Sequence, residues 1–286
     1  MGIAVNMLNG VSYGMILFII ASGLSLIFGV MGVLNLAHGA FFVLGAYIGL
    51  TLAGKGWGFV LAALAAGAAV GLLGLVLERV FLGRLYKQVN EQVLLTLGLV
   101  YIYWNAILWI WGPKSHIGKA PLALQGDIVL TSFSYPLYRL WIILIGLAIF
   151  AGLWFLEERT RIGAIMRAGM DDKQMTTGLG INYPLFSSFV FFLGAFLGGL
   201  AGFLGTPILG IQPGLSMDIL LIAIIVIVVG GVGHVAGALL GALLIGVVDA
   251  FGKAYFPDFA LFTVYLAMIV ILLSKPSGLL GRRVNS

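Results

Sequence analysis

Long apolar runs separated by short polar segments dominate the chain. An α-helix needs about 20 mostly apolar residues to cross the roughly 30 Å hydrocarbon core of a bilayer. Runs of that length predict about nine helices, with eight or ten possible, because glycine-rich sequence rather than charge separates the neighbours at 30–34 and 230–234. Each of these joins is either a broken helix or a link between two full spans. The predicted helices lie near residues 9–30, 34–54, 57–77, 92–111, 137–156, 185–206, 217–231, 234–252 and 259–274.

Composition favours a membrane protein over a soluble one. The 286 residues are 62% hydrophobic and only 9% charged, with a mean hydropathy of +1.15, whereas about a quarter of a soluble domain is charged. The sequence therefore predicts an all-α polytopic membrane protein with one transmembrane domain over residues 1–286. The first charged residue is Lys55, so no basic region precedes the first apolar run, and we interpret that run as a retained span rather than a signal peptide.

The basic residues predict an orientation, because cytoplasmic loops of membrane proteins carry an excess of Lys and Arg. If the helices simply alternate, the cytoplasmic side comprises segments 78–91, 157–184 and the C-terminus, while the N-terminus and segment 112–136 lie outside. The net charge of +5 is then mostly flanking charge, and no nucleic-acid partner is expected. The basic residues of the first side are Arg79, Arg84, Lys87, Arg159, Arg161, Arg167, Lys173, Lys275, Arg282 and Arg283, and those of the second are Lys55, Lys114, Lys119, Arg139 and Lys253.

Glycine is abundant, at 42 residues, well above the roughly 7% of average usage. Several glycines recur four positions apart, so that each set lines one face of a helix and lets a neighbouring backbone approach closely. We interpret these sets as packing faces between helices or subunits. They are Gly67 with Gly71, Gly194 with Gly198 and Gly202, and Gly237 with Gly241.

The sequence carries no convincing signature of a nucleotide site, a metal site or an enzyme. The stretch GVGHVA at 231–236 fits a dinucleotide-binding fingerprint, but it joins two membrane spans and not a strand to a helix. No Walker A sequence is present to hold ATP phosphates. His38, His116 and His234 belong to three separate segments and lack the spacing of a metal site, and cysteine is absent. No nucleophile–base pair or carboxylate dyad stands out, so an enzyme is not predicted.

The longest predicted cytoplasmic segment, ERTRIGAIMRAGMDDKQMTTGLGINYP at 158–184, has helical order. Ile162, Ile165, Met166 and Met170 recur three and four positions apart, with charged residues around the rest. This pattern predicts a short amphipathic helix. A helix lying on lipid headgroups is one interpretation, but the mixed acidic and basic face fits a protein partner better. Pro184 is expected to break the chain before the next span.

Three motifs resemble those of one transporter family. R-T-R-x-G-x-x-x-R-A at 159–168, followed by Asp171 and then Gly180-Ile181-Asn182, is similar to the coupling segment of the branched-chain amino acid family of ABC-importer permeases. GLSLIFGVMGVLNLAHGAFFVLGAY at 23–47 and GGVGHVAGALLGALLIG at 230–246 resemble the first long motif and the late Gly-rich motif of that family. The size fits the shorter, H-type permease. Thr176-Thr177 departs from the small alanine expected in the loop.

The resemblance implies a multi-subunit importer. A second, related permease would complete the pathway, two cytoplasmic ATPase subunits would bind ATP and Mg, and an extracytoplasmic binding protein would deliver substrate to segment 112–136. This chain would bind no cofactor and would lie in a bacterial-type inner membrane. Aliphatic or other amino acids, amides and urea all remain possible substrates. The positions that the resemblance implies for ATPase coupling are Arg159, Arg161, Gly163, Arg167, Ala168, Asp171 and Gly180.

Polar residues inside the spans are candidates for the substrate pathway. Asn35 and His38 follow two glycines, and a buried amide or imidazole needs a partner or a water-filled path. Residues 29–39 are therefore either an irregular element beside the path or a hydrogen-bonded link to a neighbouring helix. Asp218 and Asp249 lie toward the outer ends of their spans, which disfavours a proton relay and the alternative of a self-sufficient secondary transporter or channel. The remaining pathway candidates are Asn105, Gln212, Ser216 and Asp218.

Overall fold

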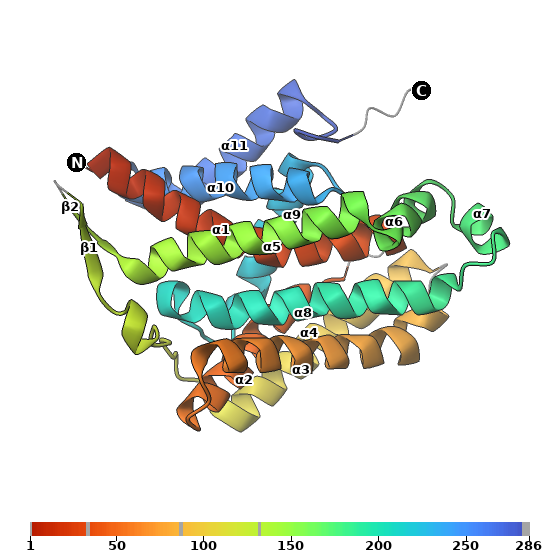
Figure 1. Ribbon diagram of the computed structural model, residues 1–286, viewed down its shortest axis with the longest axis horizontal. Coiled ribbons are helices and arrows are strands. Elements are labelled where there is room, and N and C mark those ends of the chain that lie inside the picture. Colours follow the sequence, from red (N-terminus) through yellow and green to blue (C-terminus); the bar gives the residue numbers. More distant parts are fainter. Residues whose placement is uncertain (1, 33–34, 86–87, 131–132, 282–286) are drawn as a thin grey trace.

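The computed structural model describes residues 2–281 apart from 33–34, 86–87 and 131–132, so Lys87, Arg282 and Arg283 lie outside the described residues. Helices make up nearly all of the described chain, with one small hairpin at one end (Figure 1). Three short 3-10 helices, at Leu82–Arg84, Leu122–Leu124 and Pro257–Phe259, join longer elements. The α-helices and strands are α1 (Gly2–Met31), α2 (His38–Gly54), α3 (Phe59–Val80), α4 (Val89–Trp111), β1 (Asp127–Leu130), β2 (Phe133–Pro136), α5 (Leu137–Arg159), α6 (Arg161–Asp171), α7 (Lys173–Gly178), α8 (Tyr183–Leu209), α9 (Leu215–Gly230), α10 (Val235–Tyr255) and α11 (Ala260–Ser274).

Each of the nine predicted apolar segments forms a helix, but nine full spans are not confirmed. Six helices in the described chain have the length and hydropathy to cross a membrane: α1, α3, α4, α5, α8 and α10. The helices α2, α9 and α11 are apolar but shorter, at 17, 16 and 15 residues. Hydropathy alone does not separate them from the others, because a short helix buried in a bundle is as apolar as a spanning one. The described chain is thus that of a multi-pass membrane protein with six helices that meet the length and hydropathy of a full span.

Polar contacts sort the loops into two groups at opposite ends of the bundle. We call one the basic end: residues 78–85, 157–184, 230–235 and 275–281. Here Tyr183 donates to the carbonyl of Val30 at 2.5 Å. We call the other the loop end: residues 112–130, 133–139 and 206–214, together with the C-terminal part of α10. Here Arg139 donates to Asn9 Oδ1 at 2.8 Å, so α1 runs from the loop end to the basic end.

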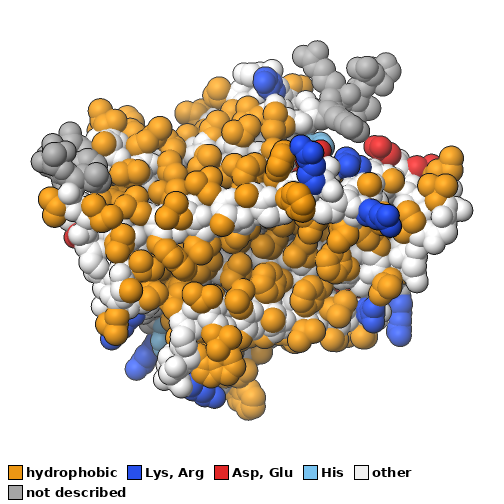
Figure 2. All heavy atoms as spheres, viewed as in Figure 1, with side chains coloured by type: hydrophobic (Ala, Val, Ile, Leu, Met, Phe, Trp, Pro, Cys, Tyr) orange, Lys and Arg blue, Asp and Glu red, His pale blue; other side chains and the backbone are white. Residues whose placement is uncertain are grey.

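Apolar side chains cover most of the visible surface between the two ends, and charged side chains gather toward the ends (Figure 2). This arrangement fits a chain whose middle contacts lipid hydrocarbon and whose ends contact water. The described basic residues also divide between the ends as the sequence predicted. Arg79 and Arg84, for example, line one groove with Asn182 at the basic end.

The interior is built on α1 and α8, which are buried along most of their length. Glycines let other helices approach these two closely, as predicted. A Cβ built on Gly194 would lie 2.6 Å from the carbonyl oxygen of Gly23, so α8 touches the backbone of α1. On α3, Gly67 and Gly71 each leave room for the ring of a phenylalanine from α8. The glycine faces therefore pack helices within this chain, where helix association depends on close van der Waals contact.

The loop end packs against the nearby ends of α2, α4 and α8. Segment 112–136, expected only to be an external loop, contains the antiparallel hairpin β1–β2, in which Asp127 pairs with Pro136 and Ile128 with Tyr135. His116 and Ile211 exchange backbone hydrogen bonds, each at 2.8 Å, which ties this segment to the link between α8 and α9.

Candidate functional site

The corner between α5 and α6 explains the spacing of the basic motif. Thr160 is the N-cap of α6, and its hydroxyl accepts the backbone N–H of Gly163 at 3.3 Å. A Cβ on Gly163 would lie 1.9 Å from the carbonyl oxygen of Glu157, so only glycine fits this close approach. Arg167 donates from Nη1 to the same carbonyl. Three motif positions therefore hold the corner together by local contacts, since the carbonyls at the end of α5 need partners.

The amphipathic helix predicted from 158–184 is confirmed as α6, and its apolar face packs on the protein. Met166 is buried, and the sulfur of Met170 lies 3.1 Å from the Cβ positions of both Gly29 and Gly233. The helix is therefore seated on the end of α1 and on the turn between α9 and α10. Its apolar side is thus largely occupied by the protein itself, with Ile162, Ile165 and Met170 half-buried.

The opposite face of the corner is open. Arg159 is the last residue of α5, and α6 begins at Arg161 and ends at Asp171. These three side chains are exposed, whereas Ala168 is half-buried. A cavity of about 460 Å³ beside them is lined by Arg167, Asp171 and His234 among others. The basic end thus presents an exposed charged surface on α6, and the contacts of the apolar face of α6 with the bundle fix its position.

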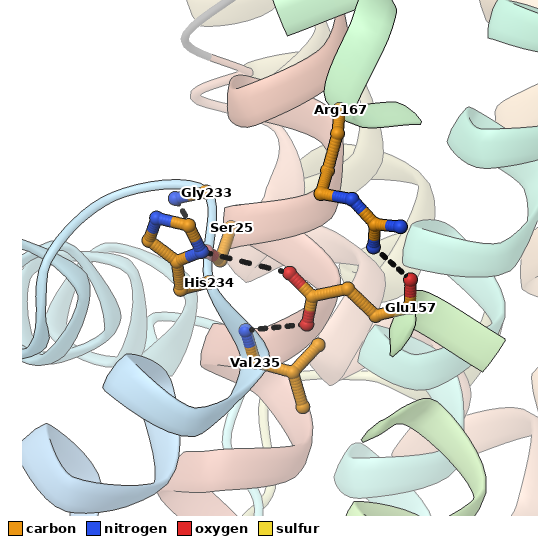
Figure 3. A network of polar contacts seen from close by, with 6 residues as sticks. All are labelled: Ser25, Glu157, Arg167, Gly233, His234 and Val235. Atoms are coloured by element: carbon orange, nitrogen blue, oxygen red, sulfur yellow. Dashed lines mark hydrogen bonds and ion pairs between the residues drawn. The ribbon is translucent and has the colours of Figure 1, made fainter. Parts of the chain in front are cut away.

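A buried carboxylate joins this corner to the turn between α9 and α10 (Figure 3). Glu157 is only 5% exposed. Its Oε2 accepts the backbone N–H of Val235 at 3.1 Å, and its Oε1 lies 3.6 Å from Nδ1 of His234. The backbone N–H of Gly233 donates to the hydroxyl of Ser25 at 3.1 Å. Residues 231–236, which fit the dinucleotide-binding fingerprint, therefore contain the turn between α9 and α10 and the start of α10. Contacts with α5 and α1 hold this turn in place.

Segment 172–182 continues along the basic end. Asp172 caps α7 by accepting the backbone N–H groups of Gln174 at 2.8 Å and Met175 at 3.0 Å. Lys173 donates from Nζ to the carbonyl of Met31 at 2.6 Å, and loss of water around the ammonium group lowers its pKa. Gly180, an exposed coupling candidate, has a φ of 84° and forms the turn before α8.

Pro184 does not break the chain before α8. It lies in the first turn of that helix, where a missing N–H costs no hydrogen bond. Asn182 caps the helix by accepting the backbone N–H of Leu185 at 3.2 Å. The helix therefore begins two residues before the predicted boundary at 185, a normal uncertainty for helix ends.

In the interior, helix α1 ends at Met31 and α2 begins at His38, far from the end of α1. His38, its first residue, places Nε2 3.0 Å from the carbonyl oxygen of Ile20. Eleven residues separate Ile20 from Met31, or about 16 Å of α-helix at the standard rise. The chain therefore turns back into the bundle, so that α2 starts at mid-depth. Gly32, the residue directly after α1, has a φ of 66°, which favours glycine.

Asn35 and His38 are fully buried and only partly paired. Asn35 Oδ1 accepts the backbone N–H of Ala37 at 3.1 Å. Within the described part of the chain, no hydrogen bond reaches Asn35 Nδ2 or His38 Nδ1. Buried polar atoms without a hydrogen bond are rare in native interiors, so these two atoms require an explanation.

The first turn of α9 meets the first turn of α2. A Cβ on Gly39 would lie 1.9 Å from the carbonyl oxygen of Ser216. Neither helix has a side chain capping its N-terminus, since the N-cap residues are Ala37 and Gly214. Two short helices thus begin side by side next to Asn35 and His38, with N-terminal N–H groups that lack intrahelical partners.

The other pathway candidates are scattered. Gln212 and Asp218 are exposed on either side of the start of α9. Asn105 does not join the group: it is exposed on α4, and its Nδ2 donates to the carbonyl of Tyr101, one turn earlier in the same helix, at 2.8 Å. Sequence could not show this, because the direction of a side chain on a uniformly apolar helix is not encoded by its neighbours.

Sequence reasoning missed two buried acids. Glu157 and Glu78, 5% and 2% exposed, both lie near the basic ends of their helices. Glu78 Oε2 accepts the hydroxyl of Ser188 at 2.5 Å, joining α3 to α8. An acid next to a basic cluster at a helix end looks like an ordinary flanking charge, and only the arrangement of the helices reveals its burial.

Comparisons with known proteins find permease components of transport systems. A family model described as the permease component of branched-chain amino acid transport systems matches residues 6–273. The high-affinity branched-chain amino acid transport system permease protein BraD of Pseudomonas aeruginosa is 31% identical over 97% of this chain and 95% of its own. The permease LivH of Escherichia coli is 28% identical over the same shares. The ribose import permease RbsC of Haemophilus influenzae is 37% identical over 37% of this chain and 34% of its own. No solved structure matches.

Proposed function

Because the chain belongs to the family of branched-chain amino acid transport permeases, we propose that it forms half of the translocation pathway of an ATP-driven importer. A second, related permease completes the pathway. Two ATPase subunits, which hold ATP and Mg, bind at the basic end, and a substrate-binding protein docks at the loop end. The substrate is a branched-chain or another amino acid, as the printed names of the relatives suggest. The basic end faces the cytoplasm.

One observation carries the ATPase partnership: α6 is anchored on its apolar side and open on its charged side. Met166 and Met170 seat it on the bundle, while Arg161 and Asp171 remain exposed. A helix held in this way moves with the elements beneath it. Because Glu157 binds both the α5–α6 corner and the joint before α10, a displacement of α6 by the ATPase reaches the core helices directly. Such a switch requires the ATPase to bind two states of the permease differently.

The pathway is proposed to pass the paired starts of α2 and α9. Helix N-termini favour anionic groups, and broken helices near mid-depth supply such termini in transporters. The unpaired atoms of Asn35 and His38 supply further donors or acceptors beside them. The bond from His38 to the carbonyl of Ile20 also positions α2 against α1, so the imidazole serves packing whether or not substrate passes it.

The partnership is tested by replacing exposed charges at the basic end. Arg159 and Arg161 are exposed, and no hydrogen bond or ion pair is seen for either within residues 2–281 as described. Arg167 is a poorer target, because its loss also removes the bond to the carbonyl of Glu157. We expect the full chain with Arg159→Glu and Arg161→Glu to lose a copurifying ATPase in detergent extracts, identified by mass spectrometry.

The matched control reverses two exposed charges at the other end, Lys114→Glu and Lys119→Glu, and should retain the ATPase. Equal unfolding midpoints for the two variants would show that neither change disrupts the fold. Absence of an ATPase from the wild-type preparation would contradict the proposal and favour a self-sufficient secondary transporter.

A further inference from the structure

A further polar cavity lies at the loop end and was not part of the sites described above. It holds about 400 Å³ between α1, α5, α8 and α10, which is within the range of small-molecule sites. It is lined by charged and amide side chains on one side and by apolar ones on the other. The lining residues are Asn6, Asn9, Tyr13, Arg139, Ile208, Leu209, Asp249, Ala250, Lys253 and Ala254.

The cavity contains a guanidinium group without an acidic partner. Arg139 donates from Nη1 to the amide oxygen of Asn9 at 2.8 Å, which is a neutral acceptor. Within the described residues, Arg139 forms no ion pair. A guanidinium group has five N–H donors in a planar fork that matches a carboxylate. Arg139 can therefore bind an anionic oxygen group without giving up a salt bridge.

The same cavity contains a buried carboxylate. Asp249 is 6% exposed and pairs with Lys253 through Oδ2 at 2.7 Å. The lysine side chain is 59% exposed and also lies over the ring of Tyr13, with Nζ 5.3 Å from its centre. Because the lysine side chain is mostly exposed, water weakens its attraction for the carboxylate. The carboxylate keeps a second oxygen, Oδ1, with which to accept a hydrogen bond from an ammonium group.

We propose that this cavity binds a zwitterion, with its anionic group on Arg139 and its ammonium group on Asp249, and that the ligand is a free aliphatic amino acid. The apolar side, with Ile208 and Leu209, receives the aliphatic side chain. The cavity is then an outer binding site for substrate released at the loop end. This assignment rests on the proposed function, since it takes the loop end as the side from which substrate arrives.

The test measures binding of radiolabelled leucine to the full chain, with whatever subunits copurify, in nanodiscs without ATP. Competitors are leucinamide, which lacks the carboxylate, and 4-methylpentanoate, which lacks the ammonium group. We expect the wild type to prefer leucine over each analogue by roughly tenfold or more, since each analogue leaves one charged group without its partner. Asp249→Asn should abolish the preference over 4-methylpentanoate, and Arg139→Gln the preference over leucinamide.

Control variants separate recognition from folding. Asp249→Glu and Arg139→Lys keep the charges and should keep both preferences in part, whereas Asp258→Asn and Lys119→Gln change exposed charges outside the cavity and should leave both preferences intact. Wild-type protein that binds no leucine, or charge variants that keep the wild-type preferences, would overturn the site. Binding is measured without ATP, so loss of the ATPase partnership and loss of this site are independent results.

A phosphatidylethanolamine headgroup offers the same chemistry, a phosphate and an ammonium group. Leucine binding is therefore compared between nanodiscs of phosphatidylglycerol alone and nanodiscs that contain phosphatidylethanolamine. Equal leucine affinity in both supports the amino acid as the ligand. If phosphatidylethanolamine prevents leucine binding, and if native mass spectrometry shows that it stays bound to wild type but not to Asp249→Asn, the amino-acid assignment is overturned in favour of the lipid.

Discussion

At the scale of single residues, the spacing of the basic motif has a local physical cause. Gly163 and Arg167 both contact the carbonyl of Glu157, while Arg159 and Arg161 are exposed. The family resemblance predicted a coupling role for all four. It could not divide them into residues that build the corner and residues that face outward, because that division depends on the angle between α5 and α6.

Gly163→Ala tests the corner. The added Cβ would lie 1.9 Å from a backbone oxygen that cannot move without displacing the end of α5. We expect a loss of about 1–3 kcal/mol in the free energy of unfolding, the usual cost of overpacking, seen as a lower thermal midpoint in detergent. Gly98→Ala is the control, because a Cβ there has no atom within 4 Å. Equal midpoints for the two variants would mean that the corner relaxes freely.

At the scale of elements, two kinds of contact join the helices: polar links at the ends and backbone contacts at glycines within the bundle. The predicted glycine faces on α3, α8 and α10 were found because their period of four is visible in the sequence. The contact of Gly45 with Gly199, which joins α2 to α8, was not predicted, since it depends on α2 turning back into the bundle. Helix periodicity therefore identifies packing faces but not their partners.

Glu157→Gln tests the link between the α5–α6 corner and the α9–α10 joint. Glutamine keeps an oxygen for the backbone N–H of Val235 but removes the charge that faces His234. We expect a loss of about 1 kcal/mol of stability and, under the proposed function, lower uptake per ATP hydrolysed in proteoliposomes that contain the whole complex. Glu158→Gln is the matched control, since Glu158 is the exposed neighbour. If both variants transport alike, Glu157 serves folding alone.

Gly45→Ala tests whether α2 is fixed against α8. A Cβ there would lie 2.2 Å from the carbonyl oxygen of Gly199, in the backbone of α8. The two helices must separate to accommodate it, so we expect about 1–3 kcal/mol of destabilisation. The thermal midpoint in detergent should fall for Gly45→Ala but not for the control Gly152→Ala, where the added Cβ has no atom within 4 Å. Equal midpoints for the two variants would show that α2 tolerates the displacement.

At the scale of the whole molecule, apolar length and basic charge predicted most of the architecture. Apolar runs identified the helical segments because hydrocarbon forces every backbone group into internal hydrogen bonds. The number of full spans was not predictable, since α2 and α9 are as apolar as complete spans but begin inside the bundle. The sequence shows Asn35 and His38 as polar residues in an apolar stretch. Only the fold shows that they lie near Ser216, because α2 and α9 are brought together by tertiary structure.

The orientation of the molecule in the membrane is the last prediction. The chain has no cysteine, so a single introduced thiol reports its own location through a membrane-impermeant maleimide. Lys119→Cys at the loop end should react in intact cells, and Arg161→Cys at the basic end only after lysis, because both residues are exposed and lie at opposite ends. The reverse pattern would place the basic end outside and remove α6 from any cytoplasmic ATPase. Since a nucleotide-driven partner works only where ATP is present, this labelling decides whether the charged face of α6 can serve the proposed role.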